Sequence, residues 1–190
     1  MANNLFRPAP LPHRSDAVKN RALLLQTARR LFDQHGVDAI SMSAVAEAAG
    51  MGKGTLYRNF DSKAQLCHAL LDEEMRALQE RTLLRLRQQG DPRADLLWFV
   101  EEAAHFTAHN TDLLMVDPRL MLARPAHLWW RQTIHALLLR AGFSGDLSYF
   151  TDAIYMLLDV QMIAFQRRVL GYDVERIVAG LHALLAFIIP

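Results

Sequence analysis

This sequence of 190 residues has a single cysteine, Cys67, and no apolar run that approaches the length of a membrane span. One cysteine excludes an intramolecular disulfide and is typical of a reducing compartment. The lack of a long apolar run excludes a transmembrane helix, because about 20 apolar residues are needed to cross a bilayer. The sequence therefore predicts a cytoplasmic protein with no membrane partner.

The N-terminal end lacks the continuous apolar stretch of a secretory signal and instead contains Pro8, Pro10 and Pro12. Proline removes a backbone donor and favours an extended chain. We expect residues 1–15 to form a flexible arm.

No segment alternates apolar and polar residues with period two, so no sheet is expected. Apolar residues make up 52 % of the chain and charged residues 22 %, as in ordinary globular proteins. Apolar residues instead recur every three or four positions, which indicates amphipathic helices. The sequence predicts an all-α fold of about nine helices, over residues 16–35, 41–49, 52–57, 62–89, 92–109, 110–126 (broken), 127–141, 146–170 and 173–188.

The net charge of +1 hides an asymmetry along the chain. Residues 1–65 carry a net charge of +4, whereas residues 66–190 carry −3. A basic head on a mildly acidic body is the distribution expected of a protein that binds a polyanion with its N-terminal part.

Residues 41–60, SMSAVAEAAGMGKGTLYRNF, predict two short helices joined by a glycine turn. Ser41 can cap the first helix with its hydroxyl. Gly50 suits the turn, because a helix that stops sharply needs a residue that tolerates positive φ. Leu56 and Phe60 lie four residues apart on the second helix and are expected to point inward.

The outer face of that second helix carries cations and hydroxyls but no carboxylate, which suits a helix in the major groove of DNA. Lys53 is the best candidate for a contact to guanine acceptors, and Arg14 lies on the arm, where it can reach phosphates or the minor groove. The residues assigned to DNA contact are Arg14, Ser41, Ser43, Lys53, Gly54, Thr55, Tyr57, Arg58 and Lys63.

The stretch resembles the DNA-binding segment of the TetR family of bacterial transcriptional repressors. The shared residues are AEAAG at 46–50, GTLY at 54–57, Phe60 and SK at 62–63. Gly52 departs from the family, which more often has serine or another capping residue there. The resemblance implies a helix-turn-helix DNA-binding domain over residues 16–62 and a helical ligand-binding and dimerisation domain over residues 63–190, with helix 62–89 connecting the two.

The last two predicted helices each carry a broad apolar stripe, which could pair with a symmetry mate as a four-helix bundle or cover the chain's own core. The resemblance implies a homodimer, because TetR-like repressors dimerise through their last two helices. The predicted interface residues are Ile154, Leu158, Gln161, Phe165, Val174, Ile177, Leu181, Leu184 and Ile188.

The C-terminal part is rich in large apolar residues, any one of which could simply fill a core. The resemblance implies a small-molecule site among them, suited to a hydrophobic or amphipathic effector. Its candidate residues are Trp98, His105, Phe106, Met121, Trp129, Gln132, His135 and Tyr155.

The sequence thus predicts a ligand-responsive DNA-binding regulator that represses from a palindromic operator as a dimer, with no cofactor and no enzymatic activity. Two alternatives stay open. Glu101, His105 and His109 share a helical face and could bind a metal in a sensor or metalloenzyme, although the glutamate of a zinc-protease motif is missing after His105. The protein could also be a DNA-binding scaffold without an effector.

Overall fold

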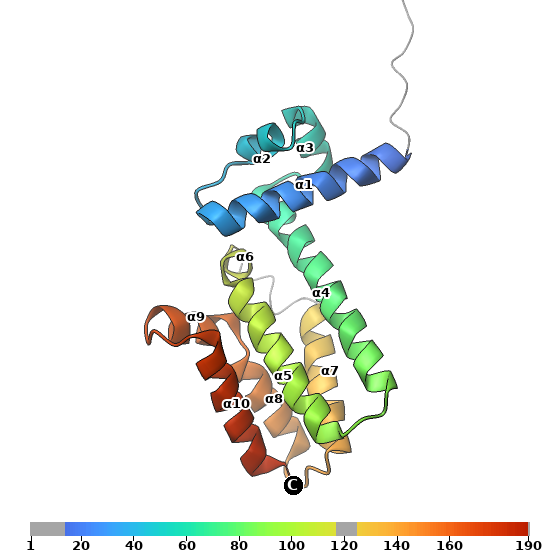
Figure 1. Ribbon diagram of the computed structural model, residues 1–190, viewed down its shortest axis with the longest axis vertical. Coiled ribbons are helices and arrows are strands. Elements are labelled where there is room, and N and C mark those ends of the chain that lie inside the picture. The colour runs from blue at the N-terminus through green and yellow to red at the C-terminus, as the bar shows by residue number, and fades with distance from the viewer. Residues whose placement is uncertain (1–13, 117–124, 190) are drawn as a thin grey trace, which may run out of the picture. The chain divides into compact units, whose positions relative to one another are not determined.

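The protein is seen here as a computed structural model, which describes residues 14–116 and 125–189 (Figure 1). Every regular element among these residues is a helix, so the all-α prediction is confirmed, with ten helices in place of about nine. The chain divides into two compact units, Met1–Leu66 and Cys67–Pro190. Residues 1–13 of the predicted arm lie outside the described residues, and its last two residues belong to the first helix.

The first unit contains α1 (Arg14–His35), α2 (Met42–Ala48) and α3 (Lys53–Asn59). The apolar stripe of α1 packs into a small core with one face of each short helix, as the spacing of these residues predicts. The side chains at its centre are buried, namely Leu24, Leu25, Ala28, Phe32, Val45, Ala46, Leu56 and Phe60.

Local signals in the sequence set the turn between α2 and α3. Ser41 caps α2, because its Oγ accepts a hydrogen bond from the backbone N–H of Ala44 at 3.1 Å. Gly50 ends α2 with a φ of 66°. Its N–H and that of Met51 donate back to the carbonyls of Glu47 and Ala46, at 2.9 and 2.8 Å. This pair of bonds is a Schellman cap, in which glycine takes the left-handed position.

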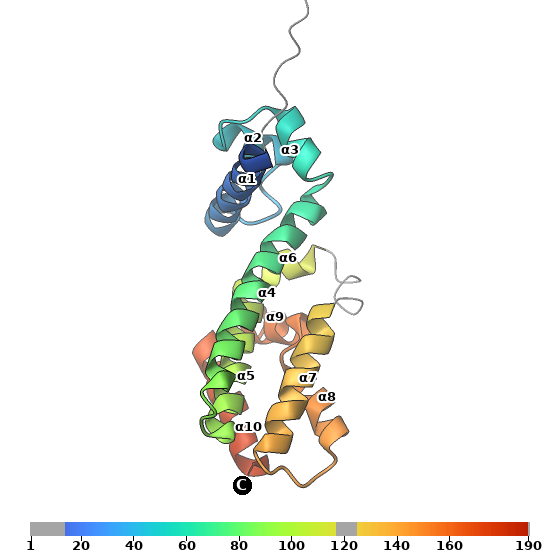
Figure 2. The same cartoon turned by 90° about the vertical axis from the view of Figure 1, so that its right-hand side faces the viewer.

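The second unit contains most of α4 and six further helices. These helices are α4 (Lys63–Arg87), α5 (Pro92–His109), α6 (Thr111–Met115), α7 (Pro125–Arg140), α8 (Leu147–Leu157), α9 (Val160–Arg168) and α10 (Val174–Ile188). Helix α5 is central and packs against α7, α9 and α10. Figure 1 shows α5 between α10 and α7, and Figure 2 shows α7 running beside α8.

The core of this unit gathers around α5. Phe99 and Val100 of α5, Ile134 and Leu138 of α7, and Ile163 of α9 are all fully buried. Each such side chain contributes roughly 1.5–3 kcal/mol through removal of apolar surface from water. These contacts join helices that are far apart in the sequence, so the core fixes how the helices of this unit pack.

The prediction of one continuous helix over residues 146–170 is wrong, because the chain breaks between α8 and α9. Asp159 begins the new helix, and its carboxylate accepts from the N–H of Gln161 at 2.8 Å. The buried hydroxyl of Thr107 on α5 donates to the carbonyl of Leu158 at 3.2 Å. A donor from a distant helix thus satisfies a backbone group at the break, and the periodicity of residues 146–170 contains no sign of it.

None of the described helices is long and apolar enough to cross a membrane.

Candidate nucleic-acid interface

Helix α3 has one buried face and one face open to solvent. Leu56 is fully buried, and Phe60, which ends the helix, is buried with it. The opposite face exposes Lys53, Gly54 and Tyr57, the last with 47 % of its surface accessible. An added Cβ at Gly54 would meet nothing within 4 Å, so the backbone there is open to close approach. This face is therefore free to enter a groove.

Arg58 lies along α3 and is held there by its own helix. Its Nε donates to the carbonyl of Gly54 at 3.1 Å, and Nη2 donates to Oγ1 of Thr55 at 3.2 Å. Asn59, which the sequence analysis did not assign a role, donates from Nδ2 to the carbonyl of Thr55 at 2.8 Å. The Thr55 hydroxyl accepts from Arg58 and keeps its own proton, so the pair presents a guanidinium and a donor side by side.

Lys63 begins α4, where the positive end of the helix dipole disfavours a cation. Its Nζ donates to the backbone carbonyl of Asp38 at 3.3 Å, in the segment between α1 and α2. This bond joins residues 25 positions apart, and no spacing in the sequence predicts it. Lys63 therefore supports the packing of the unit, and its predicted contact to phosphate stays a prediction.

Ser41 and Ser43 lie at the start of α2, with Ser41 exposed and Ser43 half-buried. Ser41 uses an oxygen lone pair as the cap, which leaves its hydroxyl proton available to an acceptor. Arg14 is the first residue of α1, and its side chain lies outside the described residues. Arg21 of α1 lies over the ring of Phe60 at 4.9 Å, a cation–π contact that ties α1 to the end of α3.

The chemistry of the helix caps differs between the two units. Ser41 and Gly52 precede α2 and α3, and Ser62 accepts from the N–H of Gln65 at the start of α4. Aspartates cap four helices of the second unit, at Asp91, Asp146, Asp159 and Asp173. A carboxylate caps a helix as well as serine does, but it repels a phosphate. Because the caps of α2, α3 and α4 are neutral, they do not repel the phosphates of a polyanion that approaches α3.

The residues predicted to line an effector site fall into separate groups. Phe106 and Trp129 belong to an aromatic cluster between α5 and α7, in which Phe106 meets Trp130 and Trp129 meets Phe99, each edge to face at 5.6 Å between ring centroids. His105 and Tyr155 are half-buried, and Gln132 is exposed on α7.

Two further residues of that predicted set, Trp98 and Met121, are not seen in this cluster. Trp98 packs under the guanidinium of Arg85 on α4, 4.9 Å from its ring centroid, and is half-buried there. Met121 lies outside the described residues. The structure thus brings two of the eight predicted residues, Phe106 and Trp129, into one aromatic cluster, which Trp130 joins.

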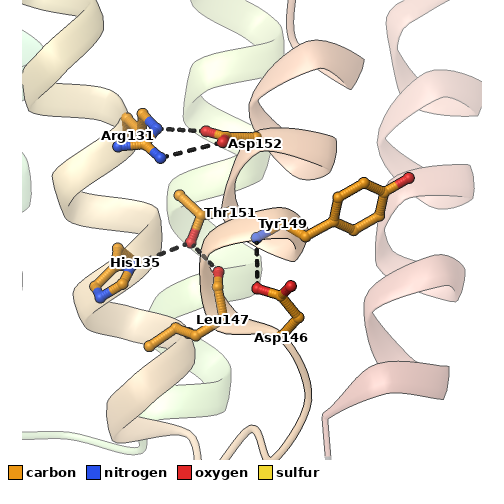
Figure 3. Close-up of polar contacts among 7 residues, drawn as sticks. All are labelled: Arg131, His135, Asp146, Leu147, Tyr149, Thr151 and Asp152. Atoms are coloured by element: carbon orange, nitrogen blue, oxygen red, sulfur yellow. Dashed lines mark hydrogen bonds and ion pairs between the residues drawn. The ribbon is translucent and has the colours of Figure 1, made fainter.

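His135 is one of several polar side chains that interact between α7 and α8 (Figure 3). Its Nδ1 lies 3.4 Å from the hydroxyl of Thr151, which also donates to the carbonyl of Leu147 at 2.7 Å. One turn away, Arg131 forms a two-bond ion pair with Asp152. Hydrogen bonding from Arg131 lowers the pKa of the Asp152 carboxyl below its ordinary value, and the same bond raises the pKa of Arg131.

The nine predicted interface residues divide by burial. Ile154, Leu158, Ile177 and Leu181 are buried in the chain's own core, so their stripe positions serve the core of this unit. Gln161, Phe165 and Leu184 are exposed, and Val174 and Ile188 are half-buried. Phe187, which the sequence analysis missed, is 89 % exposed. It lies three residues after Leu184, a helical spacing that could have pointed to it.

The metal-binding alternative is not supported by the geometry. Within residues 14–116 and 125–189, no three histidine, cysteine or acidic side chains come together as a metal site. Glu101 lies instead beside His182 of α10, with Oε2 and Nε2 3.7 Å apart. His109 is exposed at the end of α5.

The first unit therefore has the geometry of a helix-turn-helix DNA-binding segment, with a neutral-capped and cation-bearing second helix. Residues 24–70 match the family described as bacterial regulatory proteins, tetR family. The resemblance to the TetR family is confirmed for this segment.

The comparisons with curated proteins and solved structures agree with this assignment. A helix-turn-helix transcriptional regulator from Staphylococcus aureus is 42 % identical over 62 residues, which cover 33 % of this chain and 34 % of that protein. The chain therefore aligns with about a third of the length of the curated relatives that it matches.

Likeness over the whole chain is found among solved structures. A transcriptional regulator from Saccharomonospora viridis, crystallised with choline, has a TM-score of 0.74 at 20 % identity, covering 90 % of this chain and 98 % of that one. The TetR-family repressor FadR from Thermus thermophilus, crystallised with lauroyl-CoA, has a TM-score of 0.63 at 22 % identity, covering 87 % and 93 %. Over the described residues, the chain thus has the fold of these transcriptional regulators.

Proposed function

We propose that the protein is a transcriptional repressor that binds a palindromic operator as a homodimer and is released by a small hydrophobic or amphipathic effector. The observation that carries this proposal is the exposed face of α3, where Lys53, Gly54 and Tyr57 lie opposite the buried Leu56. A DNA-binding protein of this kind acts in the bacterial cytoplasm.

The roles of the DNA-contacting residues follow from their chemistry. Lys53, at the exposed start of α3, is proposed to reach base edges, with guanine O6 and N7 as the preferred acceptors. Tyr57, Thr55 and the Ser41 hydroxyl are suited to phosphate oxygens, and Arg58 adds charge. Ser43, Gly54, Lys63 and the arm residue Arg14 complete the proposed contact set.

A single short recognition helix reads few base pairs, so two copies are needed for adequate specificity. The exposed apolar side chains of α9 and α10 support a dimer through these helices, because a partner that covers them would remove apolar surface from water. Phe165, Leu184 and Phe187 are the proposed contacts, flanked by Gln161, Val174 and Ile188.

The effector part of the proposal is supported by the aromatic cluster between α5 and α7. Structural neighbours were crystallised with ligands as different as choline and lauroyl-CoA, so fold likeness gives no ligand class. Binding of an effector would favour a dimer geometry in which the two α3 helices no longer match successive major grooves, about 34–36 Å apart. The alternative, a DNA-binding scaffold without an effector, predicts operator affinity that no ligand changes.

The test begins with selection of bound fragments from a random DNA pool, followed by fluorescence anisotropy at several salt concentrations. We expect Tyr57→Ala and Lys63→Ala to weaken binding to all sequences alike, with Lys63→Ala reducing the salt slope by about one. Lys53→Ala should relax base preference at one position in each half-site.

Arg140→Ala, at the exposed end of α7, is the matched control and should bind as wild type does. Circular dichroism on every variant separates lost contacts from lost folding, which matters for Lys63 because of its bond to Asp38. Wild-type affinity in both Tyr57→Ala and Lys53→Ala would contradict the proposed interface.

A further inference from the structure

A groove in the second unit, separate from the aromatic cluster, has no role in the proposed function. It has a volume of about 370 Å³ and lies between the end of α5, α6, α9 and Tyr172. Pockets that hold small molecules have volumes of roughly 300–1,000 Å³. The groove is thus large enough for a compact organic ligand.

Arg167 of α9 is fixed at the edge of this groove. Its Nη1 donates to the carbonyl of Ala108, near the end of α5, at 2.7 Å. Among the described residues this is the one hydrogen bond that Arg167 makes, and no carboxylate pairs with it there. The other edge of the guanidinium, formed by Nε and Nη2, is left with two parallel donors. Two such donors match the two oxygens of a carboxylate or a phosphate.

The charge balance of the groove favours an anion. Asp112 is the one carboxylate among the described lining residues, and Arg168 neutralises it through an ion pair. Within the described part of the chain, the charge of Arg167 therefore has no carboxylate to balance it. This excess of positive charge lies in a part of the chain, residues 66–190, whose net charge is −3.

A smaller part of the groove lining is apolar. Ala108 and Ala164 are buried beneath it, and the ring of Tyr172 forms one side. The guanidinium of Arg176 lies 3.9 Å from the centroid of that ring, which holds the tyrosine in place by a cation–π contact. A fixed cation beside a short apolar wall selects an amphipathic anion.

We propose that this groove binds a small organic anion, with its carboxylate or phosphate on Arg167 and its apolar body against Ala164 and Tyr172. The site needs neither DNA nor a second protomer. A negative result here would leave the proposed repressor function untouched, and a failure of DNA binding would leave this site untouched.

Isothermal titration of the full-length protein with three probes tests the proposal. Phenylacetate and phenylphosphate carry the two kinds of oxyanion on one ring, and phenylacetamide is a neutral match for phenylacetate. We expect at least one anion to bind, and the amide to bind about tenfold more weakly or not at all, because a charge-assisted contact is lost. The stronger anion identifies whether carboxylates or phosphate esters are the preferred class.

Variants then locate the binding. Arg167→Gln should weaken the anion about tenfold or more, and Arg167→Lys, which keeps the charge but not the fork, should lie between it and wild type. Arg140→Gln removes an exposed arginine from α7 and should change nothing. Equal binding of acid and amide, wild-type binding in both Arg167 variants, or no binding of either anion at millimolar concentration would overturn the proposal.

Discussion

The two units of this chain encode their structure in different ways. In the first unit, neighbouring residues set the turn between α2 and α3. Ser41 caps α2 by accepting from the N–H of Ala44, and Gly50 ends α2 by donating its N–H to the carbonyl of Glu47. In the second unit the defining bonds join distant residues. The hydroxyl of Thr107 donates to the carbonyl of Leu158, which is 51 positions later in the chain. The imidazole of His182 contacts the carbonyl of Leu97, which is 85 positions earlier.

This difference explains where sequence similarity and structural similarity were found. The family match covers residues 24–70, where the local pattern carries the chemistry of DNA contact. Over the whole chain, the likeness to the structure from Saccharomonospora viridis holds at 20 % identity, because many sets of apolar residues can fill a helical core. Contact with DNA therefore restricts the sequence of this segment more than core packing restricts the sequence of the second unit.

The largest effect is expected from Phe99→Ala, which tests whether the core around α5 holds the second unit together. Phe99 is fully buried and meets Trp129 and Trp130 edge to face. Removal of a buried phenylalanine costs about 3–5 kcal/mol of the free energy of unfolding. Urea denaturation followed by tryptophan fluorescence measures it, since Trp98, Trp129 and Trp130 all lie in this unit.

Leu139→Ala is the control for Phe99→Ala, because Leu139 is 61 % exposed on α7 and should cost far less. If the two variants unfold at the same urea concentration, the central place of α5 in this core is wrong.

A second prediction sharpens the comparison of caps. Ser41→Asp should keep the stability of α2, since aspartate and serine cap equally well. It should also lower DNA affinity roughly fivefold to tenfold at low salt, on the order of 1 kcal/mol, because the carboxylate repels phosphates.

The reverse change, Asp173→Ser at the start of α10, should leave both quantities unchanged. The measurements are thermal melts and fluorescence anisotropy with the selected operator. A Ser41→Asp protein that binds DNA as wild type does would remove the proposed meaning of the neutral caps.

How much could be predicted follows the same division. The apolar spacing of α1, the cap at Ser41, the turn at Gly50 and the inward Leu56 are all local, and the structure has them as predicted. The starts of the helices predicted over residues 92–109 and 173–188 are local as well, since Pro92 begins α5 and Asp173 caps α10.

The features that could not be predicted depend on contacts across the fold. The break at Leu158 needs the hydroxyl of Thr107, and the partner of Lys63 is a carbonyl in another loop. The apolar stripe of α10 was visible in the sequence, but its division into buried Leu181 and exposed Leu184 depends on which neighbours cover it. Periodicity gives a face of a helix and does not say which partner meets that face.

A third prediction compares two glycines of the same motif. An added Cβ meets nothing within 4 Å at Gly50 or at Gly54, so any difference between them comes from the backbone. Gly50 has a φ of 66°, and Gly50→Ala should cost about 1–2 kcal/mol of stability because alanine is strained there. Gly54 lies inside α3, and Gly54→Ala should add up to about 1 kcal/mol of stability through helix propensity.

Thermal melts of both glycine variants measure these changes. A loss of stability in Gly50→Ala together with a gain in Gly54→Ala would support a turn set by local conformation. Equal destabilisation of both variants would indicate that packing around the motif matters more.

The smallest effect is expected from Asp152→Asn, which asks whether a contact between distant residues stabilises the second unit when it lies at the surface. Hydrogen bonding from Arg131 lowers the pKa of Asp152 in the folded protein, so the folded state binds fewer protons there than the unfolded state. The stabilising contribution is complete above the ordinary aspartate pKa of 3.8 and is lost as pH falls through the lower folded value.

Both side chains of the Arg131–Asp152 pair are exposed, with 46 % and 52 % of their surfaces accessible, so solvent and salt screen the pair. The melting temperature of wild type should therefore exceed that of the variant only slightly at pH 7 and low salt, and the two should converge with added salt or as acid protonates Asp152 in the folded protein. A large difference that persists in high salt would mean that surface contacts, and not only the buried core around α5, determine how α7 packs on α8.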